Sequence, residues 1–438
     1  MSQPAPPNDA ARSHTRRAYT LAILIVVYTF NFIDRQIVGI LAVPIKADLG
    51  LSDTQLGLMG GLAFALFYTF LGIPIARLAD RASRTWIMTA ALTIWSLMTA
   101  LCGLAQNFTQ LFLARLGVGI GEAGGVAPAY SLITDIFPPN QRARALSIYS
   151  FGIPIGSALG IVFGGLIASL IDWRAAFFMV GLAGIVVAPL FRLTITEPVR
   201  GRFDPPGART EPASLGEVAR MLARKPSFWG LSLGASCSSM MGYGLFFWLP
   251  SFFVRSYGIS LLEASLFFGA ILLIGGIAGL WLGGTLVDRF GERRKSLYAV
   301  IPAIAFIATV PFYIVGVLSP TLPLSFAVML VPTALGLVWL GPILAAIQHL
   351  VTPNMRATAS AIFLFINNLI GIGAGTALLG ALSDSLQAHF GDQSLRYAIL
   401  AGSGFYIAAA GLFLISSRRL ARDWEGLKAS LPKRRCPP

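Results

Sequence analysis

Four charged side chains interrupt long apolar runs of the chain: Asp34, Arg35, Arg115 and Glu122. In the hydrocarbon core of a membrane each charge costs at least ~2.5–3.5 kcal/mol, so such residues mark ion paths, proton relays or ligand counter-ions. Burial favours the neutral form of a carboxyl group, whereas a nearby arginine favours the ionised form. Asp34 and Glu122 are therefore candidates for a protonation switch, with Arg35 as the cation that compensates one of them.

A structural role is the alternative for the same residues. Asp34 and Arg35 are adjacent in the sequence and could neutralise each other while holding helices together. Arg115 lies seven residues before Glu122, which places both side chains on one helix face. Arg115 fits a structural role and a ligand-binding role equally well.

The composition indicates which elements must position these charges. Of the 438 residues 55% are hydrophobic, about 240 in all, and twelve membrane spans of ~20 residues need that number. Charged residues make up 12% of the chain, against ~25% in globular proteins. The sequence thus predicts an all-α polytopic membrane protein and excludes a soluble enzyme, a disordered chain and a nucleic-acid binder.

We predict twelve transmembrane helices in two six-helix halves, because lipid satisfies no backbone hydrogen bonds. The halves are residues 1–193 and residues 226–438, the second with a basic tail, and a cytoplasmic linker at 194–225 joins them. The spans are expected near 19–44, 53–78, 85–105, 108–135, 141–169, 174–193, 226–254, 260–287, 295–318, 322–350, 355–383 and 394–417.

The second half of the linker has a pattern of its own. Ser214 and Glu217 have the spacing of a capping box, and Leu215, Val218 and Leu222 form an apolar stripe. This pattern fits a short amphipathic helix on the membrane surface, and an ordinary solvated linker fits as well.

The basic residues indicate the orientation of the spans. Of the 33 Lys and Arg residues, 27 fall at one end of the predicted spans and four at the other. The positive-inside rule therefore places both termini and the linker in the cytoplasm, with the chain in the cell (inner) membrane. The net charge of +14 is explained by membrane orientation and does not indicate nucleic-acid binding.

The two halves also repeat each other. The segment GLS at 50–52 recurs as GIS at 258–260, and the Asp-Arg pair at 80–81 recurs at 288–289, both shifted by 208 positions. Parallel repeats of six spans are typical of transporters with a central cavity.

These repeated segments resemble a known family. LADR at 78–81 and GTLVDRFG at 284–291 resemble the loop motif of the major facilitator superfamily, and Arg115 followed by Gly119 and Gly121 resembles its fourth-helix motif. A narrower resemblance, to the Spinster branch, rests on NFIDR at 31–35, GEA at 121–123 and RARALS at 142–147.

The resemblance implies an alternating-access transporter whose first and fourth helices face the cavity together, so that Asp34 and Glu122 share one site. It also implies an inter-helix latch at the cytoplasmic helix ends, where the alternative is ordinary solvated loop charge. The expected latch residues are Asp80, Arg81, Arg84, Arg144, Asp288 and Arg289.

The second half offers different chemistry. Gly, Pro and aromatic residues in the span 226–254 suggest a broken or flexible helix, whose rings either line the cavity or face lipid. A charged wall and an aromatic wall suit an amphiphile, and Spinster relatives are associated with lysophospholipid and sphingolipid transport. The expected substrate-binding residues are Asn31, Arg35, Arg115, Glu122, Tyr243, Phe246, Phe247, Asn367 and Asn368.

The predicted function is therefore proton-coupled secondary transport of an amphiphilic, lipid-like substrate. The alternative is a proton-coupled symporter or exporter of small organic anions or drug-like compounds. A channel would be distinguished by flux without counterflow or saturation. An enzyme is not expected, because His14, His349 and His389 are scattered along the sequence. An ATP-driven pump is not expected either, because the sequence contains no G-x-x-x-x-G-K run followed by Ser or Thr. We expect no cofactor, no metal and no nucleic acid, contact with membrane lipids, and a monomer.

Overall fold

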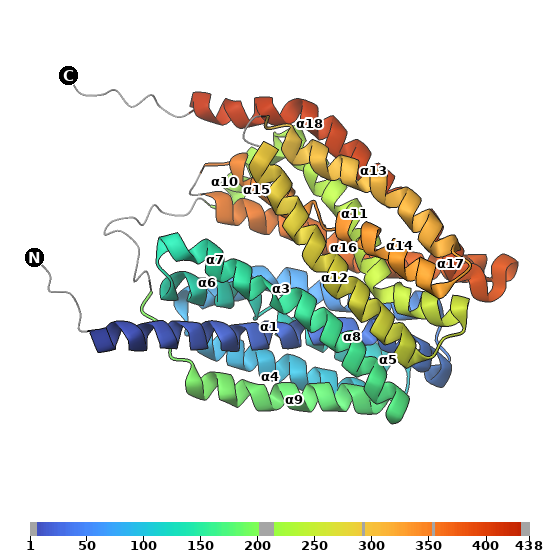
Figure 1. Cartoon of the computed structure of the whole chain (residues 1–438). Coiled ribbons are helices and arrows are strands. Elements are labelled where there is room, and N and C mark those ends of the chain that lie inside the picture. Colours follow the sequence, from blue (N-terminus) through green and yellow to red (C-terminus); the bar gives the residue numbers. More distant parts are fainter. Residues whose placement is uncertain (1–6, 201–213, 291–293, 353–354, 431–438) are drawn as a thin grey trace, which may run out of the picture. The chain divides into compact units, whose positions relative to one another are not determined.

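The computed structural model describes residues 7–200, 214–290, 294–352 and 355–430 (Figure 1). All regular structure within these ranges is helical. Apolar runs of this length must satisfy their own backbone groups in lipid, and a helix does so within a single segment. The prediction of an all-α polytopic fold is confirmed.

Ten stretches of the described residues are long and apolar enough to cross a membrane. The longest of them, Thr358–Trp424, contains two of the predicted spans. The predicted span at 108–135 is divided at 123–125 into two helices of 15 and 11 residues, each too short to count as a span. These two differences account for the step from twelve predicted spans to ten stretches.

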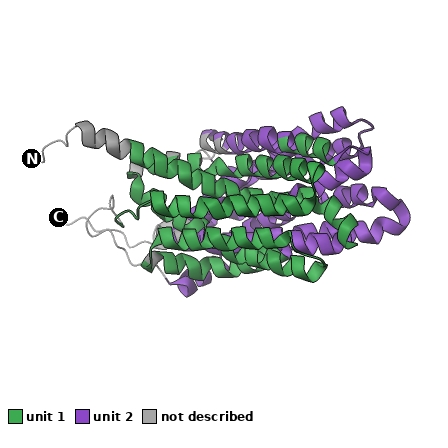
Figure 2. Ribbon diagram, turned by 90° about the horizontal axis from the view of Figure 1, so that it is seen from below, with its two compact units in different colours: residues 1–51, 63–208, 261–269 green, residues 52–62, 209–260, 270–438 purple. Residues whose placement is uncertain are grey.

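The chain forms two compact units (Figure 2). Unit 1 comprises residues 1–51, 63–208 and 261–269, and unit 2 comprises residues 52–62, 209–260 and 270–438. Helix α12 (Leu261–Phe290) begins in unit 1 and continues in unit 2. The division of the chain into halves at 193 and 226 stays a prediction.

Unit 1 holds the helices of the first half apart from α2. They are α1 (Pro7–Leu49), α3 (Leu62–Arg81), α4 (Arg84–Cys102), α5 (Phe108–Glu122), α6 (Val126–Ile136), α7 (Pro139–Ser150), α8 (Gly152–Leu170) and α9 (Trp173–Thr194). Helix α1 packs on α8, and α4 packs on α5 and α9. At the first contact, a Cβ on Gly160 would lie 2.8 Å from the carbonyl oxygen of Ile33. A small residue there lets the two helices touch, which fixes the position of the adjacent Asp34.

Unit 2 is built around α11. Its helices are α2 (Asp53–Gly60), α10 (Leu215–Ala223), α11 (Pro226–Tyr257), α13 (Leu297–Leu318), α14 (Leu322–Leu335), α15 (Leu340–His349), α16 (Arg356–Phe390), η2 (Gly391–Gln393), α17 (Ser394–Gly402) and α18 (Gly404–Ser430). Helix α11 packs on α16 and α18, and α2 packs on α16. A Cβ on Gly57 of α2 would lie 2.4 Å from the Thr376 carbonyl oxygen, so this glycine permits the close contact.

Two local expectations have different outcomes. The first expectation is a broken or flexible helix in the seventh predicted span. Helix α11 is continuous from Pro226 to Tyr257, so the expectation of a break there is wrong, and a flexible helix stays a prediction. In the linker, Ser214 accepts a hydrogen bond from the Glu217 backbone N–H, and α10 buries Val218 and Leu222. An amphipathic helix therefore forms where a solvated linker was the alternative. Linker residues 201–213 lie outside the described residues.

Candidate functional site

The four charges predicted inside the membrane meet in unit 1. Asp34 and Arg35 lie on α1, and Arg115 and Glu122 lie on α5. Asp34 and Arg115 are 1% exposed, and Glu122 is fully buried. Asn31 lies one helical turn before Asp34 and is also buried. The structure thus places Asp34 and Glu122 in one region of unit 1, and that they share one functional site stays a prediction.

The two acids differ in their partners. Arg35 Nε donates to Glu122 Oε2 at 2.7 Å, which forms a buried ion pair. Arg115 Nη1 donates to the backbone carbonyl of Asp34 at 3.3 Å and not to its carboxylate. Among the described residues, Asp34 Oδ1 accepts no hydrogen bond. Arg35 therefore compensates Glu122, and the alternative in which Asp34 and Arg35 neutralise each other is not the arrangement found.

Unit 2 brings together the expected amides of α16 and a serine of α11. Ser239 Oγ donates to Asn367 Oδ1 at 2.9 Å, and the Asn367 amide nitrogen lies 3.5 Å from Asn368 Oδ1. Asn367 is buried and Asn368 is half-buried. This polar contact lies inside the unit at the α11–α16 crossing, where it can bind a ligand or hold the helices together.

The three expected aromatic residues on α11 are not equivalent. The rings of Tyr243 and Phe246 meet edge to face at 6.4 Å, and both side chains are half-buried. Phe247 is buried against α2, because a Cβ on Gly60 would lie 2.2 Å from its ring. Tyr243 and Phe246 are therefore better placed than Phe247 to meet a substrate.

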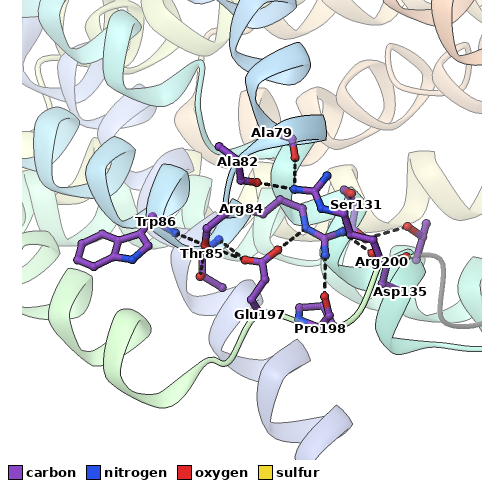
Figure 3. A network of polar contacts seen from close by, with 12 residues as sticks. Ala79, Ala82, Arg84, Thr85, Trp86, Ser131, Asp135, Glu197, Pro198 and Arg200 are labelled. Atoms are coloured by element: carbon purple, nitrogen blue, oxygen red, sulfur yellow. Dashed lines mark hydrogen bonds and ion pairs between the residues drawn. The ribbon is translucent and has the colours of Figure 1, made fainter.

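Arg84 is the centre of a polar network in unit 1 (Figure 3). This first residue of α4 is 1% exposed, and its Nε donates to Glu197 Oε1 at 2.7 Å. Nη1 donates to Ser131 Oγ at 2.8 Å and to the carboxylate of Asp135, and Nη2 donates to the Pro198 carbonyl at 3.1 Å. The guanidinium thus joins α4, α6 and the chain after α9.

Glu197 connects this network to the start of α4. Its Oε2 accepts from the Thr85 backbone N–H at 2.9 Å and from Ser83 Oγ at 3.0 Å. Burial raises the pKa of Glu197, but these hydrogen bonds and the Arg84 guanidinium outweigh burial, so its pKa lies below the ordinary value. Nearby, Arg200 donates to the carbonyls of Ala79 and Ala82.

The remaining expected latch residues are described only in part. Arg81 and Arg289 are exposed. The side chains of Asp80, Arg144 and Asp288 lie outside the described residues.

Nothing in the sequence singles out a further ion pair, which lies in unit 2. Asp53, 1% exposed at the start of α2, accepts hydrogen bonds from both terminal nitrogens of Arg255 at 2.7 Å each. Ser383 Oγ donates to the same carboxylate, and Asp384 caps α2 by accepting from the backbone N–H groups of Asp53 and Thr54. Carboxylates are common at helix starts, so only the fold distinguishes Asp53. Asp384 lies near the end of α16, far from Asp53 in the sequence.

The helical spans and the buried charges define a multi-pass membrane transporter, not an enzyme. A model of the Major Facilitator Superfamily matches residues 24–376, and the chain belongs to that superfamily, in its Spinster branch. The twelve-helix fold in two six-helix halves follows from this membership.

Two relatives and one solved structure illustrate the similarity. An MFS-type efflux pump of Mycolicibacterium smegmatis is 36% identical, over 95% of this chain and 96% of that protein. Protein spinster homolog 3 of Danio rerio is 28% identical, over 96% of this chain and 89% of that protein. A bacterial homolog of the human lysosomal transporter Spinster, in an inward-facing and unoccupied conformation, superposes with a TM-score of 0.86 at 34% identity, over 93% of this chain and 98% of that one.

Proposed function

We propose that this transporter is proton-coupled and moves an amphiphilic, lipid-like substrate by alternating access. One observation carries the coupling: two buried carboxyl groups lie in one region of unit 1, and among the described residues Glu122 forms an ion pair with an arginine whereas Asp34 does not. An ionised carboxylate is costly inside a membrane unless it is paired, so taking up a proton is a means of removing that cost. A proton shifts the access states only by its different affinity for each of them.

The proposed roles follow the chemistry of each group. Asp34, Glu122 and Arg35 form the proton-coupling set, and Arg35 and Arg115 bind an anionic head group. Tyr243 and Phe246 contact the apolar chain of the substrate. Arg84, with Glu197, is the part of the proposed latch whose contacts support that role.

We further propose a monomer in the inner membrane with both termini in the cytoplasm. The support is the excess of basic residues at one end of the spans, which is the ordinary signal for the cytoplasmic side.

Export of small organic anions or drug-like compounds is the second candidate. The similarity to an MFS-type efflux pump at 36% identity favours it. In that case Arg35 and Arg115 would bind the anion, and aromatic residues of α11 would contribute little.

The coupling is tested with Asp34→Asn, Glu122→Gln and the double variant. Distances between spin labels on the two units, measured against pH in lipid discs, report the conformational equilibrium. Each single variant should weaken its pH dependence, because neutralising an acid imitates low pH, and the double variant should lose most of it.

The matched control is Asp48→Asn. Asp48 pairs with Arg174, but its side chain is 44% exposed, so this variant should titrate like the wild type. If the double variant titrates like the wild type as well, the two buried acids are structural and the proposed coupling fails.

A further inference from the structure

The guanidinium of Arg35 lies over three aromatic rings. Its Cζ is 4.9 Å from the centroid of Phe32, 4.8 Å from that of Phe64 and 4.6 Å from that of Tyr68. A cation within about 6 Å of a ring centroid is attracted by the negative face of the ring, most strongly where water is excluded. We call these three residues the aromatic cage.

The cage is held in place by packing. Phe64 is 2% exposed and stacks on Tyr68 with the ring centroids 5.0 Å apart. A Cβ on Gly119 of α5 would lie 2.5 Å from the Phe64 carbonyl oxygen, so α3 and α5 touch at this point. Phe32 meets the edge of Tyr28 at 5.2 Å. The rings therefore have fixed positions on α1 and α3, next to the α5 helix that carries Glu122.

Phe64 also serves the second buried arginine. Its centroid is 5.9 Å from Cζ of Arg115, so one ring lies near two guanidinium groups. Aromatic faces attract a cation without carrying a group that titrates near neutral pH. The attraction of the rings for a guanidinium therefore does not itself depend on the protonation of the rings.

We infer that Phe32, Phe64 and Tyr68 are positioning residues that hold Arg35 beside Glu122 and retain it when Glu122 is neutral. The second part rests on the proposed proton coupling. When Glu122 is ionised, both the carboxylate and the cage hold the guanidinium. When Glu122 is protonated, the cage still attracts the guanidinium. A weaker cage lets Arg35 depart from the protonated site, which favours protonation and moves the titration midpoint to higher pH.

The test changes the electrostatics of Phe64 without changing its shape. Phenylalanine carrying one, two or three fluorine atoms is incorporated at position 64, since each fluorine weakens the negative face of the ring. The melting temperature of the purified protein should fall stepwise with fluorine number. In the Arg35→Gln background most of this dependence should disappear. A packing role alone would give equal dependence in both backgrounds, which would overturn the inference.

Phe177 is a matched control position, and Tyr68 is a second position at which the inference can be tested. Phe177 is also buried in unit 1 and meets Trp173 edge to face at 6.0 Å. Fluorination of Phe177 should therefore change the melting temperature by the same amount in the wild type and in the Arg35→Gln background. If Arg35→Gln fails to fold, Tyr68→Phe and Tyr68→Leu replace it. Tyr68→Phe keeps the ring and should behave like the wild type, whereas Tyr68→Leu should not.

The pH titration separates this inference from the proposed function. Tyr68→Leu and trifluorinated Phe64 should each raise the midpoint of the conformational equilibrium by about half a pH unit, the equivalent of one cation–π contact. If the conformational equilibrium of the wild type does not depend on pH, the proposed proton coupling is contradicted. The melting temperatures of the fluorinated variants still test the cage in that case. A titrating wild type with a flat fluorine series contradicts the cage alone.

Discussion

Glu197 is held ionised by the groups around it, and this has a consequence for stability. Its pKa lies below the ordinary value, because hydrogen bonds and Arg84 outweigh the effect of burial. A depressed carboxyl pKa stabilises the fold above the ordinary pKa, and that stabilisation is lost as the pH falls through the lowered one. The side chain is partly exposed, so the effect is screened and small.

Glu197→Gln should therefore lower the melting temperature at neutral pH by about 1–3 °C. The difference from the wild type should shrink as the pH falls below ~4.3, the ordinary glutamate pKa. Glu217→Gln, a change of the same kind on the exposed face of α10, is the control and should leave the melting temperature close to that of the wild type. A pH-independent loss in Glu197→Gln would mean that only packing was disturbed.

Single residues differed in how visible they were in the sequence. Asp34, Arg35, Arg115 and Glu122 could be found because a charge in an apolar run is rare. Their pairing could not be found from the sequence. Whether Arg35 pairs with the adjacent Asp34 or with Glu122 of another helix depends on how the helices pack. The partners of Arg84 escaped notice for a related reason: they lie at helix ends, where charges are common.

A buried ion pair and two close glycine contacts hold α2 in unit 2. Asp53→Asn leaves the Arg255 guanidinium, only 16% exposed, without its counter-charge. Removing one partner of a buried pair costs about 3–5 kcal/mol, whereas an exposed pair contributes about 0–1 kcal/mol. We expect Asp53→Asn to destabilise the protein strongly and Asp48→Asn, the exposed pair of unit 1, to have little effect.

Thermal unfolding of both variants in the same detergent measures this difference. Arg255→Gln added to Asp53→Asn should recover part of the loss, because it removes the uncompensated charge. Equal losses in the Asp53 and Asp48 variants would show that the buried pair does not anchor α2.

Elements were predicted where a pattern is continuous and missed where it is interrupted. The apolar runs and the Ser214 cap located the long helices and α10 because hydrophobic length and a capping side chain are local properties. The turn at 123–125 and the interruption between α14 and α15 occur inside apolar runs, so hydropathy does not reveal them. Conversely, glycines in α11 suggested a break that helix packing does not require.

At the level of the whole molecule, charge asymmetry and the internal repeat were sufficient to predict a transporter fold. They do not show that residues 52–62 belong with unit 2 or that 261–269 belong with unit 1. Those memberships depend on contacts between segments far apart in the sequence, such as Thr376 donating to the Gly57 carbonyl at 2.7 Å.

The two proposed functions differ most clearly in the class of substrate. The dependence of binding affinity on the length of the ligand's acyl chain measures this difference. Burying one methylene group contributes about 0.8 kcal/mol, so the affinity for a lysolipid should rise about fourfold per added methylene until the apolar site is filled. Arg115→Gln should weaken binding by a similar factor at every chain length, because it acts on the head group. Tyr243→Ala and Phe246→Ala should reduce the dependence on acyl-chain length instead.

Trp281→Leu, which alters a 69% exposed ring on α12, is the control and should leave the affinity and its dependence on acyl-chain length unchanged. Competition against a fluorescent lysolipid, below its micelle-forming concentration, gives these affinities. Short carboxylates that bind as tightly as long-chain ligands, with no effect of the α11 variants, would establish the organic-anion alternative.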